Sequence, residues 1–151
     1  MARGRCSAYD HKACHVRPTL EVLRTAGEVY SAHVADDVVV WYNPRCSKCQ
    51  GAEELLAAHG VSWRRLRYLD DPPARDEIVQ VLALLGTTDP RAMMRMQEAR
   101  YVEMGLAQAC DDRLLDAMAA YPELIERPIV IRPDRAIVAR PPELLLSLLG
   151  T

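Results

Sequence analysis

The stretch Val38-Val39-Val40-Trp41-Tyr42-Asn43-Pro44-Arg45-Cys46-Ser47-Lys48-Cys49 predicts a strand, a tight loop and the start of a helix. The β-branched and aromatic residues of 38–42 are typical of a buried strand, and Asn43-Pro44 ends it. Ser47 and Gln50 have the spacing of a capping box, and Gly60 supplies a stop signal. We therefore expect a helix over 47–59.

The next hundred residues extend this pattern. Residues 62–69 predict a second strand that ends at Asp70-Asp71-Pro72-Pro73, and the resulting strand-helix-strand unit should have parallel strands and a right-handed crossover. Residues 73–85 predict a helix because their apolar residues recur at i, i+3, i+4 and i+7. Short helices are expected within 89–106 and over 111–120.

The C-terminal part predicts a hairpin followed by a helix. Two β-branched runs, 129–131 and 136–138, flank Pro133-Asp134-Arg135, and the leucine-rich stretch 142–150 opens with proline and ends with glycine. This order predicts an α/β thioredoxin-like fold in which an all-helical segment, about 89–121, is inserted before the C-terminal β-hairpin and helix.

Composition limits the possible functions. The chain has 151 residues, half of them hydrophobic and 26% charged, with a net charge of −2, which predicts one globular domain and no direct nucleic-acid binding. Its apolar runs are too short to span a membrane, and the first residues lack the apolar centre of a signal peptide. We therefore expect a cytoplasmic protein with reduced thiols.

Residues 1–37 show no strong periodicity, and we expect a disordered or weakly ordered extension that precedes a domain over 38–150. Cysteine and histidine, the residue types that zinc prefers, occur in this extension at Cys6, His11, Cys14 and His15. Their spacing fits no closed zinc pattern, so we predict no metal site.

The strongest chemical signal is the pair Cys46 and Cys49 between a strand and a helix. Cys46 should lie at the positive end of the helix dipole beside Arg45 and Lys48, and each of these favours the thiolate. We expect its pKa to fall below the ordinary value of about 8.5. A zinc half-site or two buried apolar side chains would give the same spacing, but no second cysteine pair follows, which favours a reactive thiolate.

Residues 38–150 resemble the glutaredoxin-linked arsenate reductases of the ArsC type, within the ArsC/Spx superfamily. The matching segments are Tyr42 to Lys48, Tyr68-Leu69-Asp70-Asp71-Pro72-Pro73, Arg91-Ala92-Met93-Met94-Arg95, Tyr101 through Gly105-Leu106, Leu124-Ile125-Glu126-Arg127-Pro128-Ile129-Val130 and Arg140-Pro141-Pro142-Glu143. Because these segments are spread over the whole domain, they identify the superfamily with high specificity. They are less specific for the substrate.

The resemblance implies that Cys46 attacks the arsenic of arsenate, that glutathione completes the reduction as co-substrate, and that glutaredoxin reduces the resulting mixed disulfide. It assigns oxyanion binding to three arginines: Arg95, Arg127 and Arg140. Several fixed guanidinium groups are physically required, because a thiolate and an oxyanion repel each other. The family pattern also places Asn43, Pro44, Ser47 and Pro128 near the site. No bound cofactor is implied, and we predict a cis Arg127-Pro128 peptide opposite Cys46.

Two residues depart from the family pattern. Tyr42 stands where well-known members have histidine, which removes part of the expected activation of the nucleophile. Cys49 stands where many members have serine, and a second thiol one turn from Cys46 could resolve an intermediate and allow thioredoxin to replace glutathione. Cys110 has no basic neighbour before it and two aspartates after it, so we expect it to be inert.

Two other functions share these features. Spx-type redox regulators carry the same Cys-x-x-Cys loop and bind the C-terminal domain of the RNA polymerase α subunit, but Arg140 in Arg-Pro-Pro-Glu matches the reductases. A general thiol-disulfide oxidoreductase would need only the cysteines, and three convergent arginines would then have no anion to bind. The sequence therefore favours an arsenate reductase.

Overall fold

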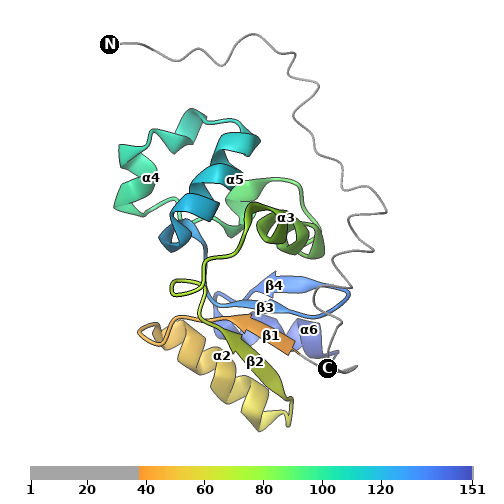
Figure 1. The fold of residues 1–151 in the computed structure, drawn as a ribbon. Helices are drawn as coiled ribbons and strands as arrows, with labels where there is room; N and C mark the ends of the chain where they lie inside the picture. The colour runs from red at the N-terminus through yellow and green to blue at the C-terminus, as the bar shows by residue number, and fades with distance from the viewer. Residues whose placement is uncertain (1–37, 151) are drawn as a thin grey trace, which may run out of the picture.

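A mixed four-stranded sheet lies at the centre of the computed structural model, which describes residues 38–150 (Figure 1). Its order is β2-β1-β3-β4, formed by β1 (Val38–Trp41), β2 (Trp63–Leu66), β3 (Ile129–Ile131) and β4 (Ala136–Val138). β1 pairs with β2 in parallel, and β3 pairs antiparallel with both β1 and β4. The predicted parallel pair and the predicted hairpin are thus confirmed.

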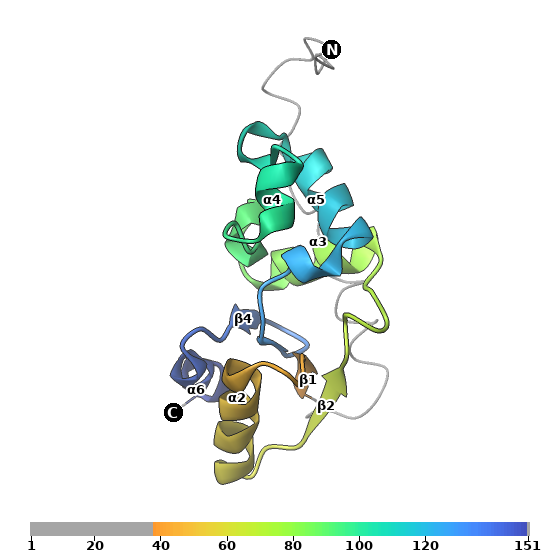
Figure 2. The same cartoon turned by 90° about the vertical axis from the view of Figure 1, so that its left-hand side faces the viewer.

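Helices cover both faces of the sheet. α2 (Ser47–Ala58) and the C-terminal α6 (Leu146–Leu149) lie on one face, and the 3₁₀ turn Pro142–Leu145 leads into α6. α3 (Arg75–Leu84), α4 (Ala99–Glu103) and α5 (Asp111–Ala120) form a helical layer on the opposite side, as Figure 2 shows. Gly51 lets α2 approach the C-terminal turn, because a Cβ there would lie 3.3 Å from Cγ of Pro142.

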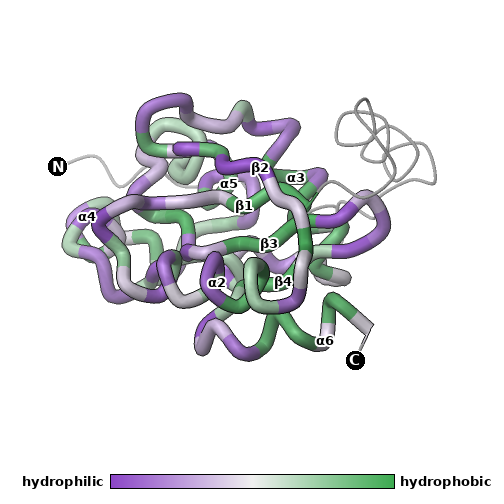
Figure 3. The backbone as a smooth tube through the Cα atoms, turned by 90° about the horizontal axis from the view of Figure 1, so that it is seen from below, coloured by the Kyte–Doolittle hydropathy of each residue, from purple (hydrophilic) through white to green (hydrophobic). Residues whose placement is uncertain are grey.

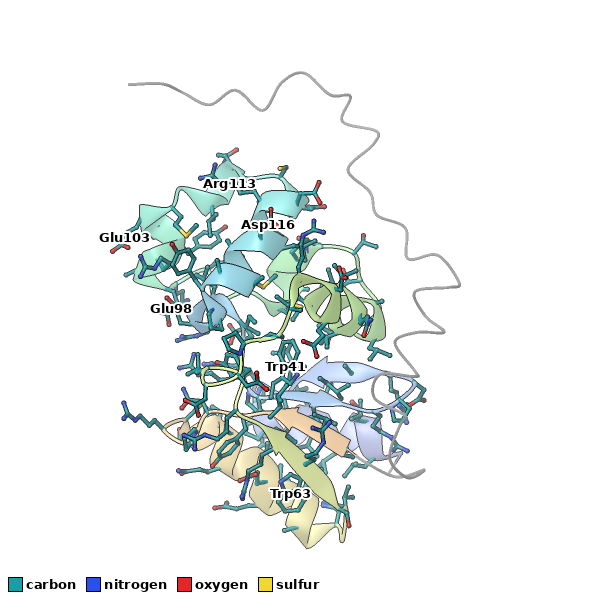
Figure 4. All side chains as sticks on the ribbon, in the orientation of Figure 1. Trp41, Trp63, Glu98, Glu103, Arg113 and Asp116 are labelled. Carbon is teal, nitrogen blue, oxygen red and sulfur yellow. The ribbon has the colours of Figure 1, made fainter. Side chains whose placement is uncertain are left out.

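The strand β1 divides the apolar core into two parts. Val39 and Trp41 pack toward the helical layer of α3 and α5, whereas Val38 and Val40 pack against α2 and α6. This division follows from the alternation of side chains along a strand. In the hydropathy colouring of Figure 3, β1 and β3 are green, whereas β2 is not, and Figure 4 shows Trp41 on the side of the helical layer and Trp63 on the side of α2.

The secondary structure departs from prediction in four places, of which the first is α3, because it begins at Arg75 rather than at Pro73. β2 ends at Leu66 rather than 69, because the chain then turns and the amide of Asp70 donates to Arg67 O at 2.8 Å. Residues 89–106 hold little α-helix besides α4: Pro90–Met93 is a 3₁₀ turn, and Met94 next forms a β-bridge with Ile125. The stretch 142–150 begins as 3₁₀ rather than α-helix.

The architecture is the predicted α/β thioredoxin-like fold, with 3₁₀ and α-helical elements between α3 and the hairpin. No helix within residues 38–150 is both long enough and apolar enough to cross a bilayer. The expected N-terminal extension, and with it Cys6, His11, Cys14 and His15, lies outside the described residues.

Candidate active site

Cys46 occupies the N-cap position of α2, at the end of the loop that leaves β1. Its backbone is extended, its amide donates to Asn43 O at 3.0 Å, and its own carbonyl accepts from the amide of Cys49 at 3.0 Å. The predicted capping box of Ser47 and Gln50 is wrong, because Ser47 is already the first helical residue. Gln50 instead donates from Nε2 to Pro44 O at 3.3 Å and fastens the loop to the helix.

The sulfur of Cys46 is partly exposed and lies at the amino end of a twelve-residue helix. Burial by itself would raise the pKa of Cys46, but the backbone amides of Cys49 and Lys48 and the side chains of Cys49 and Arg127 outweigh this effect and lower the pKa. The sulfur does not close a capping hydrogen bond of ordinary geometry, yet it is near enough to these donors for them to stabilise the thiolate.

Cys49 lies one turn further along α2 and is fully buried. The amide of Asn43 donates to its Sγ at 3.5 Å. Burial raises the pKa of Cys49 to about 12, and the negative charge of Cys46 adds to the increase. The pair therefore consists of Cys46, whose ionisation is favoured, and Cys49, which stays a neutral thiol and can donate a hydrogen bond to the Cys46 thiolate.

Arg127 is the predicted arginine that the structure brings to Cys46. Burial lowers the pKa of its guanidinium, but the neighbouring Tyr68 and Cys46 outweigh this effect and raise the pKa. Its Nε has no hydrogen-bond partner among the described residues. The Arg127-Pro128 peptide is cis, as predicted, and a second cis peptide precedes Pro141, which the sequence did not predict. Pro128 is buried and immediately precedes β3.

The other two predicted arginines are engaged with carboxylates. Arg95 forms an ion pair with Glu98 and donates to Glu123 O at 3.3 Å. Arg140 donates to Oε2 of Glu126 at 3.3 Å. Within residues 38–150, neither guanidinium is among the main influences on the pKa of Cys46, although Arg95 is near enough to Tyr68 to affect the pKa of that tyrosine. In Figure 4, Glu98 lies on the side of the helical layer that faces the sheet.

Tyr68 is a buried residue of this site that sequence reasoning left without a role. Its ring stacks on Trp41 with a centroid distance of 6.2 Å, and its hydroxyl has no partner among residues 38–150. Burial raises the pKa of Tyr68 to about 12, while nearby Arg127 opposes the increase. The only sequence signal was the position of Tyr68 within a family segment, because nothing local indicates that its hydroxyl turns inward.

Glu53 of α2 lies in a network of hydrogen bonds that includes Tyr42, the residue after β1. Glu53 is 8% exposed and accepts hydrogen bonds from Trp63 Nε1 at 2.8 Å and from Arg65. Burial would raise the pKa of Glu53, but these bonds and one from Tyr42 lower it. The Arg65 guanidinium lies 5.3 Å from the centroid of the Tyr42 ring. Tyr42 thus joins a structural network beside the loop.

Other potential ligands are scattered. Within the described part of the chain, no three histidine, cysteine, aspartate or glutamate side chains gather where a metal ion could bind. Cys110 occupies the N-cap position of α5 and is partly exposed.

A cysteine of lowered pKa at a helix N-terminus, with a guanidinium beside it and a cis-proline next to that arginine, defines a thiol-active protein of the thioredoxin fold. The chain belongs to the ArsC family, whose family model matches residues 41–148. An arsenate reductase of Neisseria meningitidis is 39% identical over 71% of this chain and 93% of its own length, and that of Escherichia coli K12 is 36% identical over 75% and 81%. The structure of an arsenate reductase from Vibrio cholerae is 40% identical, with a TM-score of 0.72 over 76% of this chain and 98% of that one.

Proposed function

We propose that the protein reduces arsenate to arsenite with Cys46 as the nucleophile. The observation that carries this proposal is the juxtaposition of Cys46 and Arg127, in which a thiolate is formed beside a guanidinium with an unpaired N–H. A small tetrahedral oxyanion can accept that N–H while it approaches the sulfur. The names of the Neisseria and Escherichia relatives support arsenate as the oxyanion.

In the first step, the Cys46 thiolate attacks arsenic(V) and displaces one arsenate oxygen, which leaves as water after protonation. In the second step, the thiolate of glutathione attacks the Cys46 sulfur, so that the sulfur–arsenic bond breaks and its electron pair remains on arsenic. Arsenate and two thiols are thereby converted to arsenite, one disulfide and one water. Arsenic gains two electrons, and each sulfur loses one. Glutaredoxin then restores the Cys46 thiol.

Arg95 and Arg140 serve as further oxyanion ligands in this proposal, and each must first give up its carboxylate. Glu98 is 28% exposed and Glu126 is 26% exposed, so both ion pairs border solvent and can exchange one anion for another. An arsenate dianion offers each guanidinium more negative charge than a single carboxylate does.

Cys49 can replace glutathione as the second thiol. The negative charge of Cys46 helps to keep Cys49 protonated. When Cys46 is bound to arsenic, this charge is gone, and Cys49 can lose its proton more easily. Its attack on the Cys46 sulfur would release arsenite and leave a Cys46–Cys49 disulfide, a two-electron product that thioredoxin can reduce.

A coupled assay tests the reaction and its reductant. Purified protein, arsenate and NADPH are combined either with glutathione, its reductase and glutaredoxin, or with thioredoxin and its reductase. We expect NADPH oxidation that requires both arsenate and Cys46, so Cys46→Ser should abolish it while Cys110→Ser retains it. Turnover that is independent of arsenate or of Cys46 would refute the proposal. Unchanged turnover of Cys49→Ser with both reductants would refute the resolving role.

General thiol-disulfide exchange is the second candidate. The engagement of Arg95 and Arg140 with glutamates favours it, because disulfide exchange needs no oxyanion site. In that case, the protein would reduce a small disulfide through Cys46 with either reductant and would show no arsenate-dependent turnover.

A further inference from the structure

A pocket lies between the loop that leads to Cys46 and the turn after β2, and it includes none of the three proposed oxyanion arginines. Its volume is about 300 Å³, at the lower end of the range for small-molecule sites. The lining residues come from the loop after β1 and the turn after β2: Tyr42, Asn43, Pro44, Arg45, Arg67, Leu69 and Asp70. We propose that this pocket binds the reducing co-substrate, a small peptide thiol with two carboxylates and one ammonium group, an assignment that rests on the proposed function.

The backbone holds the two walls of the pocket together. The amide of Tyr42 donates to Leu66 O at 2.8 Å, which joins the loop after β1 to the end of β2. The amides of Asp70 and Asp71 both donate to Arg67 O, at 2.8 and 3.0 Å, so the second wall is a closed turn. In the first wall, the Arg45 amide donates to Oδ1 of Asn43 at 2.9 Å. The pocket is therefore formed before any ligand arrives.

The charges of the lining match a zwitterionic peptide. Arg45 and Arg67 supply two positive charges and Asp70 supplies one negative charge. Glutathione carries the complement, because its glutamyl end has an ammonium and a carboxylate and its glycine end has a second carboxylate. Arg67 and Asp70 are paired at 2.7 Å with both side chains 61% exposed, and an exposed ion pair of this kind contributes little stability. A glutamyl zwitterion can insert there and satisfy both partners.

The pocket also lies at the right place for the reaction. Arg45 lines the pocket and is the residue before Cys46, whose amide donates to O of Asn43, another lining residue, at 3.0 Å. The exposed Leu69 and the ring of Tyr42 add apolar surface for the middle of the peptide. A peptide held here presents its thiol to the Cys46 sulfur, while the oxyanion occupies the side of Arg127.

Binding of S-methylglutathione tests the assignment without chemistry, because its blocked thiol cannot react. We expect saturable NMR shifts of the amides of Tyr42, Asn43 and Arg45 and of the 67–70 turn in the full-length protein. Arg45→Glu and Arg67→Glu should each weaken binding by about tenfold, because each reverses a charge that a carboxylate needs. Arg64→Glu is the matched control, since Arg64 is also exposed on β2 and does not line the pocket; its affinity should equal that of wild type.

The ligand supplies a second comparison. The diethyl ester of S-methylglutathione lacks both carboxylates and should bind the wild type several-fold more weakly than the acid does. Equal affinity for acid and ester, equal affinity across the three variants, or shifts confined to other residues would overturn the pocket assignment.

The two proposals can fail separately. Dithiothreitol has no carboxylate and needs no such pocket. Arsenate reduction with dithiothreitol, but without binding of S-methylglutathione, would refute the pocket and leave the proposed activity intact. Specific binding at residues 42–45 and 67–70, but no arsenate reduction with any thiol, would refute the activity and support the pocket.

Discussion

The Arg127 guanidinium lies beside the Cys46 sulfur, and each group favours the charged form of the other. The pKa of Cys46 is lowered despite partial burial, with Arg127 among the causes, and the pKa of Arg127 is raised despite burial, with Cys46 among the causes. This mutual stabilisation joins the loop after β1 to the chain just before β3, two segments that are about eighty residues apart in sequence. The stability of the Cys46 thiolate therefore depends on the tertiary fold as well as on the amino end of α2.

The first prediction is that Arg127→Gln raises the pKa of Cys46. A lowered pKa means that the thiolate fraction, and with it the rate of alkylation by iodoacetamide, rises to its plateau around a midpoint that lies at lower pH than that of an ordinary thiol. Without the guanidinium, this plateau should move to higher pH. Arg64→Gln removes an exposed arginine of β2 and should leave the profile unchanged. An unshifted Arg127→Gln profile would show that the helix amides alone hold the thiolate.

The second prediction tests whether a hydrogen bond from Cys49 lowers the pKa of Cys46. Its neutral thiol helps to lower the pKa of Cys46 by hydrogen bonding. Cys49→Ser keeps a donor at this position, so the alkylation profile of Cys46 should stay close to that of the wild type. Cys49→Ala removes the donor and should shift the plateau to higher pH. Identical profiles for the serine and alanine variants would assign the low pKa to the backbone and Arg127.

The strand-loop-helix at Cys46 was predictable because its signals are local. A β-branched run, Asn43-Pro44 and the stop at Gly60 act within a few residues of the elements that they limit, and they fix β1 and α2 to within one residue. The N-cap residue of α2 was predicted wrongly as Ser47, whereas the structure has Cys46 at this position. The two residues are neighbours, and only the backbone conformation shows which of them is the last extended residue.

The surroundings of the thiolate could not be predicted in the same way. The pairing of Arg95 with Glu98 and of Arg140 with Glu126 depends on side-chain positions that a family pattern does not carry. Tyr68 gains its importance from tertiary structure, because Trp41 and Arg127 reach it from other elements. The hydrogen bonds of Glu53 with Trp63 and Arg65 also depend on tertiary structure, because they join α2 to β2.

The third prediction concerns stability. Glu53→Gln should lower the free energy of unfolding by about 2 kcal/mol at neutral pH, because it removes a charged acceptor shared by Trp63 and Arg65. The folded-state pKa of Glu53 is lowered, so this stabilisation is present above the unfolded pKa of about 4.3 and is lost as the pH falls through the folded value. Urea denaturation at pH 7 and at acid pH measures both effects. Glu54→Gln, the exposed neighbour, should change little; an equal loss in both variants would contradict the role of the network.

The fourth prediction is that Glu126→Gln improves oxyanion binding. Glu126 accepts a hydrogen bond from Arg140 and so holds this guanidinium. Its neutralisation should free the guanidinium and lower the KM for arsenate several-fold, with a smaller effect on kcat. Glu103→Gln is the control, because Glu103 pairs with Arg100 on the outer part of the helical layer. A higher KM in Glu126→Gln would mean that the glutamate positions Arg140 instead of competing with the substrate.

The fifth prediction concerns the buried hydroxyl of Tyr68. A buried hydroxyl without a partner costs about 1–3 kcal/mol, so Tyr68→Phe should be as stable as the wild type or more stable. The same hydroxyl faces Arg127, the guanidinium that we expect to bind the oxyanion, and it can donate to that anion when the site is filled. We therefore expect kcat/KM for arsenate to fall about tenfold, a loss typical of one charge-assisted hydrogen bond.

Chemical denaturation measures the stability of Tyr68→Phe, and initial rates measure its kcat/KM. Tyr101→Phe is the control, because Tyr101 is a buried tyrosine in α4 outside the site. Lower stability of Tyr68→Phe would mean that the hydroxyl stabilises the fold, and an unchanged kcat/KM would mean that it takes no part in oxyanion binding.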